Sequence, residues 1–306
     1  MTRVLVVNAG STSLKLSVVD GGEVRAVESF DADADAVAHR VVHGGDGFRE
    51  PVVIDEGVVA ALERLVELAP LHNAPALQGI AEARAALPDV PHVAVFDTAF
   101  HATLPAVAWT IAVPDHLGVR RYGFHGLAVQ SVAEQVGVDR LVVCHLGGGS
   151  SVTAVLEGRS VETSMGFTPL EGVPMTTRSG SVDPGAVLHL ARRLGEDELG
   201  RVLERESGLL ALSGFSGDVR ELEADPRGDF ALELFAYRVA QAVASCAVAL
   251  GGLEAVAFSG GIGENSQRVR DAVAARLEHL RPFDVHVVAA REDVVAAREA
   301  LGVLAL

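Results

Sequence analysis

The chain has 306 residues, 49% of them hydrophobic and 22% charged, which is typical of a globular protein with room for two domains. Its formal net charge of −16 argues against a nucleic acid partner, because phosphate backbones are bound by clustered lysines and arginines. No signal peptide is evident, and no apolar run is expected to be long enough to span a membrane, so we expect a cytoplasmic protein without a membrane partner. Cys144 and Cys246 lie in apolar runs and are expected to be buried, reduced thiols.

Two passages share one order of predicted elements: strand, Gly/Ser loop, strand, turn, strand. The predicted strands cover 4–7, 14–20 and 23–29 in the first passage and 141–146, 152–157 and 159–164 in the second. We interpret this as a repeat of architecture rather than of sequence, with both Gly/Ser tips facing a common cleft. The pattern predicts an α/β fold made of two similar halves.

Helices are predicted where apolar residues recur at helical spacing. They cover 55–69, 81–88, 126–137, 185–195, 230–252, 267–280 and 292–302. A strand at 255–259 is expected to enter a glycine loop, and the acidic segment 31–36 is expected to be a solvated loop.

Lys15 is the single lysine of the chain, and it follows a loop of Gly, Ser and Thr at 10–13. Such a loop can cradle a phosphate, because its backbone N–H groups and hydroxyls donate hydrogen bonds and the lysine adds a point charge. It is not a Walker A loop, since Leu14-Lys15-Leu16 continues as a strand rather than a helix. An ordinary hairpin with an exposed lysine is the alternative.

Two further glycine loops follow apolar strands: "HLGGGSS" at 145–151 and "SGGIGEN" at 259–265. Each is weak evidence by itself, but three such loops together indicate phosphate binding. The third leads into a predicted helix, whose N-terminal N–H groups and dipole favour a phosphate.

Three loop residues suit phosphoryl transfer, and each has a structural alternative. Arg178, among small polar residues, either meets a phosphate or is an ordinary surface arginine. Asp97, at the end of a strand, suits either magnesium or the N-cap of a helix. His125, in "RRYGFHG", is either catalytic or structural.

The motifs that carry a family resemblance are, in chain order, "VNAGSTSLKLSV", "HRVVHGG", "APLHNAPAL", "VFDTAFHATLP", "RRYGFHG", "HLGGGSS", "TSMGFTPLEGVPMTTRSGSVDPG", "SGLLALSGFSGDVR" and "FSGGIGEN". Through these motifs the chain resembles the acetate kinases. The resemblance implies two duplicated ribonuclease-H-like domains, as in actin, Hsp70 and sugar kinases, around a nucleotide cleft. The implied domains are 1–101 completed by 293–306, and 102–292 for nucleotide binding and dimerisation.

The resemblance also implies a reaction: reversible, in-line transfer of the γ-phosphoryl group of ATP to acetate, giving acetyl phosphate and ADP, with Mg²⁺ (or Mn²⁺). A carboxylate acceptor is already ionised at neutral pH and needs no general base, unlike the hydroxyl group of a sugar. Propionate, butyrate or another short-chain acid is the alternative acceptor, and a non-catalytic nucleotide-binding module is a third possibility. A homodimer is implied as well.

The site residues follow from the resemblance motif by motif. The implied catalytic residues are Lys15, Arg40, Asp97, His125 and Arg178. The implied pocket for the methyl group of the acid contains, besides Arg40, the residues Val42, Leu71, Phe124 and Pro169. The implied metal-side residues are Asn8 and Glu292. The implied nucleotide contacts are Ser11, Ser13, Lys15, His145, Gly147, Gly148, Gly149, Gly260, Gly261, Ile262, Gly263 and Asn265.

The sequence also departs from the family pattern. It is shorter than expected before "AHRVVHGG", before "ESGLLALSG" and after "GIGEN". In the second glycine loop, Gly148 stands where the family has asparagine, so one side-chain contact to phosphate is lost while the backbone N–H remains.

Overall fold

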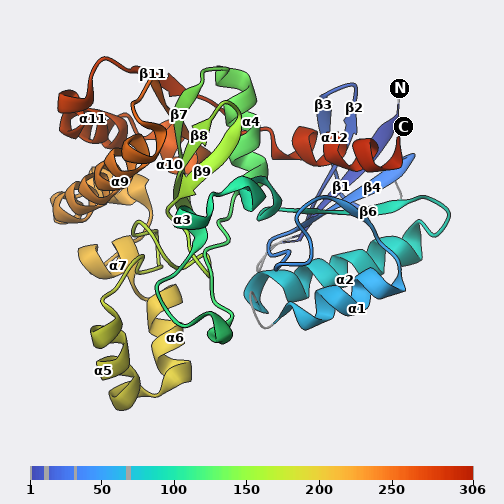
Figure 1. Ribbon diagram of the computed structural model, residues 1–306, viewed down its shortest axis with the longest axis horizontal. Coiled ribbons are helices and arrows are strands. Elements are labelled where there is room, and N and C mark those ends of the chain that lie inside the picture. The colour runs from blue at the N-terminus through green and yellow to red at the C-terminus, as the bar shows by residue number, and fades with distance from the viewer. Residues whose placement is uncertain (1, 10–13, 31–32, 67–69, 306) are drawn as a thin grey trace. The chain divides into compact units, whose positions relative to one another are not determined.

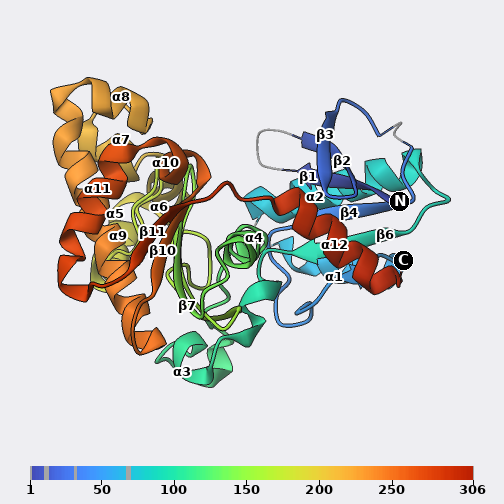
Figure 2. The ribbon, with the colours of Figure 1, turned by 90° about the horizontal axis from the view of Figure 1, so that it is seen from above.

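The computed structural model describes residues 2–9, 14–30, 33–66 and 70–305, without the side chains of 70–72. The chain divides into two compact units (Figure 1 and, turned by 90°, Figure 2). Unit 1 consists of 1–102, 124–131 and 291–306, and unit 2 of 103–123 and 132–290. The predicted domains differ from these units mainly at 124–131 and at Glu292, which belong to unit 1.

Unit 1 is built on a six-stranded sheet of order β3-β2-β1-β4-β6-β5. Its strands are β1 Arg3–Ala9, β2 Leu14–Asp20, β3 Glu23–Val27, β4 Ala36–Val41, β5 Val52–Val53 and β6 His92–Phe96. β1, β2 and β3 form an antiparallel meander, and β4 and β6 continue the sheet in parallel with β1. Its helices are α1 Glu56–Arg64, α2 Pro70–Ala86, α12 Glu292–Leu304 and the first part of α4 Gly126–Val136.

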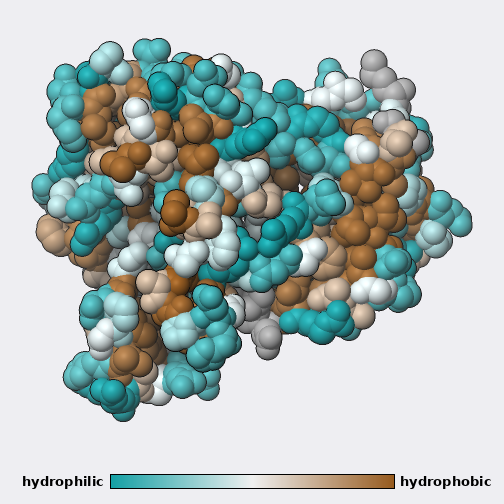
Figure 3. All heavy atoms as spheres, in the orientation of Figure 1, coloured by the Kyte–Doolittle hydropathy of each residue, from teal (hydrophilic) through white to brown (hydrophobic). Residues whose placement is uncertain are grey.

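Alternation along the strands gives the sheet of unit 1 two apolar faces. Val4 and Val6 pack with α12, whereas Leu5 and Val7 face α2. Figure 1 shows α12 on one side of this sheet and α1 and α2 on the other. In Figure 3, apolar residues of the viewed face gather over the strands between α12 and α2.

Unit 2 repeats the arrangement with a five-stranded sheet of order β11-β10-β7-β8-β9. Its strands are β7 Arg140–Leu146, β8 Ser150–Leu156, β9 Arg159–Thr163, β10 Ala255–Ser259 and β11 Asp284–Val287. An antiparallel meander is again followed by two parallel strands, so the predicted repeat of architecture is confirmed. The helices are α3 Ala106–Trp109, the rest of α4, α5 Pro184–Leu194, α6 Glu196–Arg205, α7 Gly208–Ser213, α8 Val219–Ala224, α9 Asp229–Leu250, α10 Gly260–Asn265 and α11 Gln267–Arg276.

The long helix α9 is the centre of the unit 2 core. Phe235, Val239 and Val243 are fully buried and pack in one cluster with Cys144 and Cys246. Both cysteines are free and buried, as predicted. Burial raises the pKa of both thiols, because the thiolate loses its hydration.

One helix contradicts the expectation that no apolar run is long enough to span a membrane. Of the described residues, one helical stretch, Pro226–Leu250, is long and apolar enough to span a membrane by length and composition. Half of the most apolar segment of this stretch is buried inside the structure, where α9 packs on β7, β8 and β9. A long core helix meets the same criterion, so this stretch is weak evidence for a membrane segment.

Several elements differ from the sequence prediction. The helix predicted for 55–69 ends as α1 at Arg64, and α2 begins at Pro70, where the fixed φ of proline suits a first turn. The third glycine loop is largely the short helix α10, entered through Gly260 at φ +77°. A Cβ at Gly260 would lie 2.6 Å from the Leu146 carbonyl oxygen, so glycine is required where the chain turns against β7.

A buried histidine on β4 should make unit 1 sensitive to acid. Burial, and secondarily His92 and Arg84, lower the pKa of His39 to about 3, and His39 Nε2 lies 2.9 Å from His92 Nδ1. The unfolded chain therefore binds this proton near pH 6.5 and the folded chain only near pH 3. We expect the free energy of unfolding to fall as the pH drops from 6.5 towards 3, by roughly 1–4 kcal/mol from this group.

Urea unfolding of wild type and His39→Gln at several pH values between 7 and 4 measures this contribution. The pH dependence should be weaker in His39→Gln and unchanged in the control His189→Gln, since His189 is exposed on α5. Parallel curves for wild type and His39→Gln would contradict the prediction.

Candidate active site

Three neighbouring parallel strands of unit 1 end in polar residues on one face of the sheet. Asn8 lies near the end of β1, Arg40 near the end of β4, and Asp97 directly after β6. The residue two positions earlier in each strand lies on the same face of the sheet. These residues, Val6, Ala38 and Val95, pack with α12. Strand order and a period of two therefore bring the three side chains to the carboxyl edge of the sheet, where open α/β sheets commonly bind ligands.

Arg40 is the centre of this cluster. Its Nε and Nη2 donate to the two carboxylate oxygens of Asp97 at 2.9 and 2.7 Å, a bidentate pair. Its Nη1 donates to Asn8 Oδ1 at 3.3 Å and lies 3.1 Å from Glu292 Oε2 on α12. Burial opposes the charge of Arg40, but Asp97 and Glu292 outweigh it and raise the pKa of the guanidinium. Asp97 thus fixes the arginine with both of its carboxylate oxygens.

Lys15 lies on the same face of the sheet. β1 and β2 pair with Asn8 directly opposite Lys15, and side chains of opposed residues share a face. The Lys15 side chain is exposed, whereas Arg40 is only 18% exposed. Ser11 and Ser13, the predicted phosphate contacts of this loop, lie outside the described residues.

The cluster fits a magnesium–nucleotide complex better than a free-standing metal site. Asn8 and Glu292 direct one amide and one carboxylate oxygen at the same nitrogen of Arg40, and both are ligand types that Mg²⁺ accepts. The described residues contain no group of three or more His, Cys, Asp or Glu placed to hold a metal. Mg²⁺ commonly binds through one or two protein oxygens together with phosphates and water, so this donor set suits it.

His125 occupies a turn between Phe124 and Gly126. Its φ is +62°, a left-handed conformation that few non-glycine residues adopt. Gly126 donates its N–H to the Asp97 carbonyl at 2.9 Å, and a Cβ there would lie 2.2 Å from that oxygen. The turn bearing His125 is thereby fixed directly against the residue that orients Arg40.

A second histidine supports this turn from the core. His101 Nε2 lies 2.9 Å from the Phe124 carbonyl oxygen, which can only accept, so Nε2 carries the proton. Burial lowers the pKa of His101 to about 4, although the bond to Phe124 and the charge of Asp97 oppose this. His101 is therefore neutral at pH 7. It was not among the predicted site residues, and only its presence in the motif "VFDTAFHATLP" pointed to it.

The residues predicted for the apolar pocket belong to different units, and each is described in its own unit. Phe124 is buried in unit 1, with its ring edge-on to His43 at 5.4 Å, and Val42 is half-buried directly after β4. Pro169 is half-buried in unit 2. The side chain of Leu71 lies outside the described part of the structure.

Arg178, in unit 2, lies on a loop tied down by backbone hydrogen bonds. The N–H of Met175 donates to the Arg178 carbonyl at 3.0 Å, and the N–H of Ser179 donates to the Leu203 carbonyl at 2.9 Å. Arg178 Nη1 donates to the Pro169 carbonyl at 3.3 Å. Burial lowers the pKa of Arg178, and Glu204 opposes this shift. Arg178 is thus a partly buried arginine rather than an ordinary surface one.

Unit 2 contains a cavity of about 730 Å³ at the carboxyl ends of β7 and β10. One wall is the glycine loop after β7, with Gly147 and Gly148, and another is α10 with Gly261, Ile262 and Asn265. Thr176 Oγ1 donates to the Gly148 carbonyl at 3.2 Å and connects the first wall to the loop of Arg178. The size and the glycine-lined wall suit a nucleotide.

Comparison with known proteins places the chain in a family. The acetokinase family matches residues 22–292. This chain belongs to the acetokinase family. It is 42% identical over 288 residues to an acetate kinase from Oceanobacillus iheyensis, with 88% of this chain and 72% of that protein covered.

Solved structures agree with this assignment. The chain is similar to a propionate kinase from Francisella tularensis, with a TM-score of 0.91, 31% identity, and 99% and 100% of the two chains covered. It also shares the fold of a ROK family protein from Streptococcus pneumoniae, with a TM-score of 0.52, 12% identity, and 99% and 98% of the chains covered. The predicted fold class of duplicated actin-like domains is confirmed.

The nucleotide contacts predicted for this acetokinase coincide with the cavity in part. Gly147, Gly148, Gly261, Ile262 and Asn265 line it, and a Cβ at Gly148 would meet no heavy atom within 4 Å. The predicted contacts of unit 2 outside its lining are His145, Gly149, Gly260 and Gly263, and Lys15 belongs to unit 1. The lining residues missed by the prediction are Thr176, Thr177, Gly217, Asp218, Val219, Arg220, Glu223 and Ser266.

Two of these differences between the predicted contacts and the cavity lining can be explained. His145 lies opposite Ser259 in the sheet, and His145 Nδ1 is 2.9 Å from Ser259 Oγ, so it braces the two strands beneath the loops. Asp218, Val219 and Arg220 belong to the motif "SGLLALSGFSGDVR", which supported the family resemblance but contributed no predicted site residue.

Proposed function

We propose that this acetokinase transfers the γ-phosphoryl group of ATP reversibly to acetate, forming acetyl phosphate and ADP. Family membership supports this, as do a nucleotide-sized cavity in unit 2 and an arginine-centred cluster in unit 1. A cytoplasmic location and a homodimer stay predictions.

The observation that carries the proposal is the burial and hydrogen bonding of the Asp97 carboxylate. Of the described residues it is the one buried carboxylate, and both of its oxygens accept hydrogen bonds from Arg40. A kinase that phosphorylates a hydroxyl group needs a carboxylate free to take the proton. A carboxylic acid acceptor brings no such proton, so a site whose buried carboxylate is already engaged suits acetate.

The reaction needs positioning and charge neutralisation more than covalent chemistry. An acetate oxygen forms a bond to the γ-phosphorus, and the bond from that phosphorus to the β,γ-bridging oxygen breaks, in line and without a phosphoenzyme. We assign Arg40, Lys15 and His125 in unit 1 and Arg178 in unit 2 to the substrate carboxylate and the transferring group, where negative charge must be stabilised.

Mg²⁺ is the metal that we propose, with Asn8 and Glu292 on its side of the site. When bound with the nucleotide, it would neutralise phosphate charge. Asp97, by contrast, acts through Arg40, whose orientation it fixes with two hydrogen bonds. ATP and ADP are the nucleotides expected in the unit 2 cavity.

An assay that traps acyl phosphate as a hydroxamate tests the proposal directly. We expect product from the purified chain with ATP, MgCl₂ and acetate, and none when acetate, ATP or MgCl₂ is left out. If acetate, propionate and butyrate all yield no acyl phosphate while a sugar is phosphorylated, the proposal is wrong.

The second candidate is a kinase for a longer acid, since a structure 31% identical to this chain is described as a propionate kinase. The size of the pocket predicted around Val42 and Phe124 should distinguish the two candidates, because it limits the length of the acid. One methylene in an apolar pocket is worth roughly 1–3 kcal/mol, so acetate should be preferred, propionate accepted more weakly and butyrate poorly.

Val42→Ala should enlarge the pocket and narrow the difference between acetate and propionate by roughly 5- to 10-fold in kcat/KM. Specificity constants for the three acids on both proteins measure this, with Val53→Ala, at an exposed position of β5, as the control. Butyrate as the best acid of the wild type would favour the second candidate. An unchanged acetate-to-propionate ratio in Val42→Ala would contradict the pocket assignment.

A further inference from the structure

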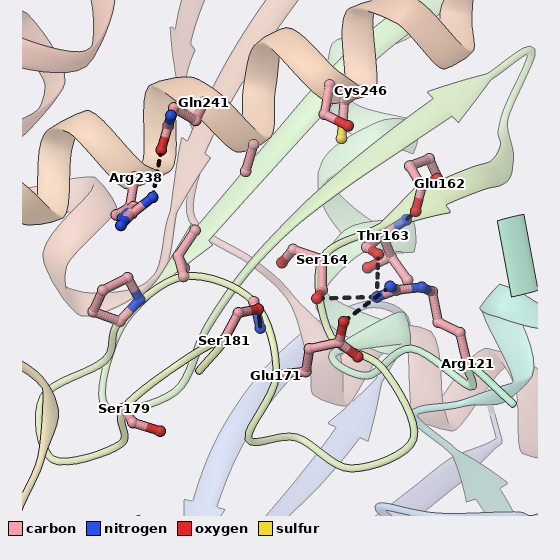
Figure 4. Close-up of a pocket in the computed structure, with 15 residues that line it drawn as sticks. Arg121, Glu162, Thr163, Ser164, Glu171, Ser179, Ser181, Arg238, Gln241 and Cys246 are labelled. Atoms are coloured by element: carbon pink, nitrogen blue, oxygen red, sulfur yellow. Dashed lines mark hydrogen bonds and ion pairs between the residues drawn. The ribbon is translucent and has the colours of Figure 1, made fainter. Parts of the chain in front are cut away.

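Arg121 has no role in the proposed chemistry, yet it has an unusually complete set of partners. It lies in unit 2, in the motif "RRYGFHG", and its side chain is 20% exposed. Its Nη1 donates to three consecutive carbonyls, those of Thr163, Ser164 and Met165, at 3.0, 3.1 and 3.1 Å. Its Nη2 lies 3.1 Å from Glu171 Oε1. One guanidinium thus holds both the start and the middle of the loop that follows β9 (Figure 4).

The backbone beside Arg121 holds the same loop. The N–H of Tyr122 donates to the Gly166 carbonyl at 2.9 Å. Glu171 covers Gly166 so closely that a Cβ at Gly166 would lie 1.6 Å from Glu171 Oε2. The loop is therefore closed on itself by the carboxylate that also meets Arg121, and a side chain at position 166 would have to displace that carboxylate.

The far end of this closed loop reaches Arg178. Gly172, next to Glu171, accepts a hydrogen bond from the N–H of Ser181 at 2.9 Å, so the two arms of 171–181 run together. Pro169, between Gly166 and Glu171, accepts the hydrogen bond of Arg178 Nη1 at 3.3 Å. A displacement of 166–171 would move the carbonyl that this guanidinium contacts.

We propose that Arg121 and Glu171 form a clamp that positions Arg178 for phosphoryl transfer. This inference rests on the proposed function, in which Arg178 contacts the transferring group. Arg121 and Glu171 are positioning residues and act through the loop. A planar guanidinium is required, because a lysine ammonium cannot place donors on three successive carbonyls and a carboxylate at once.

The clamp can be disturbed without touching the nucleotide cavity. Arg121 and Glu171 line a separate cavity of about 430 Å³, together with Arg238 and Gln241 of α9, and neither contributes to the nucleotide-sized cavity. Arg238 Nη1 donates to Gln241 Oε1 at 2.9 Å, a contact within α9. Arg238→Lys is therefore the matched control for Arg121→Lys.

The test is a double-mutant cycle on acyl phosphate formation with Arg121→Lys, Glu171→Gln and Arg178→Ala. We expect Arg121→Lys to lower kcat roughly 10- to 100-fold with the KM for ATP unchanged, and Glu171→Gln to lower it less. In the Arg178→Ala background, either change should cause no further loss, because the clamp acts through Arg178. Losses that multiply in the double variants, a loss in the Arg238→Lys control equal to that of Arg121→Lys, or full activity in both clamp variants would overturn the proposal.

A second readout does not depend on the reaction. Amide hydrogen exchange of 164–181 should be faster in Arg121→Lys and Glu171→Gln than in wild type, while β7 and β8 keep their protection. Unchanged exchange in this loop would overturn the clamp. Failure of the wild type to phosphorylate any short-chain acid would instead overturn the proposed function, while the exchange measurement still decides whether the clamp holds the loop.

Discussion

Replacing Arg178 by alanine is expected to lower kcat by about 10²–10³-fold and to leave ATP binding almost unchanged. The transferring group carries more charge on its equatorial oxygens, and needs more stabilisation, in the transition state than in bound ATP, so a cation aimed at it contributes mainly to turnover. The loop should survive the truncation, because its backbone bonds between Met175 and Arg178 and between Ser179 and Leu203 do not involve the guanidinium. The loss would then report the missing charge.

Steady-state kinetics with acetate and ATP, together with calorimetric ATP binding, measure both quantities. Arg192→Ala is the control, because Arg192 is an exposed arginine of α5 in the same unit. Arg178→Ala could instead weaken ATP binding by the same factor as it lowers activity, or weaken ATP binding while kcat stays normal. Either result would show that Arg178 is a ground-state nucleotide contact.

Replacing Arg40 by alanine is expected to affect stability as well as activity. Asp97 is 1% exposed and would lose both donors of its carboxylate, and Glu292 and Asn8 would lose their shared partner. Breaking a buried ion pair from one side costs about 3–5 kcal/mol, because an unpaired charge is left in the interior. We therefore expect a loss of this size in the free energy of unfolding and activity near the limit of detection.

A double replacement separates the two effects. Arg40→Met with Asp97→Leu removes the buried charge together with its partner, so most of the lost stability should return while activity does not. Urea unfolding and the hydroxamate assay on the single and double variants provide the comparison. A double variant no more stable than Arg40→Ala would show that the pair is not the source of the cost, and a double variant with substantial activity would contradict the role of Arg40.

The sequence predicted what depends on local pattern. Apolar runs separated by Gly/Ser loops and turns gave the two meanders, and the confirmed sheets follow that order. Arg40 and Asp97 were assigned through motif resemblance, which required no knowledge of the strand order. That order explains why they meet: β4 and β6 are neighbours, and both residues fall on the face that carries Ala38 and Val95.

Contacts between distant segments could not be predicted in this way. The clamp joins Arg121 to residues more than 40 positions later in the chain. Neither the residue type nor the spacing indicates that one guanidinium donates hydrogen bonds to three carbonyls. The glycine-rich stretch at 260–265 appeared as a loop because glycine has low helix propensity. Tertiary packing against β7 instead makes it the helix α10.

The two cysteines have a practical consequence for studying this acetokinase. Cys144 on β7 and Cys246 on α9 lie in the same core cluster of unit 2, and unit 1 contains no cysteine. Thiol reagents act on the exposed thiolate, so they can label this chain only after unit 2 opens. The natural sequence therefore contains its own chemical reporter for one half of the molecule. Pulsed alkylation followed by mass spectrometry would measure how often unit 2 opens, with no engineered probe and no signal from unit 1.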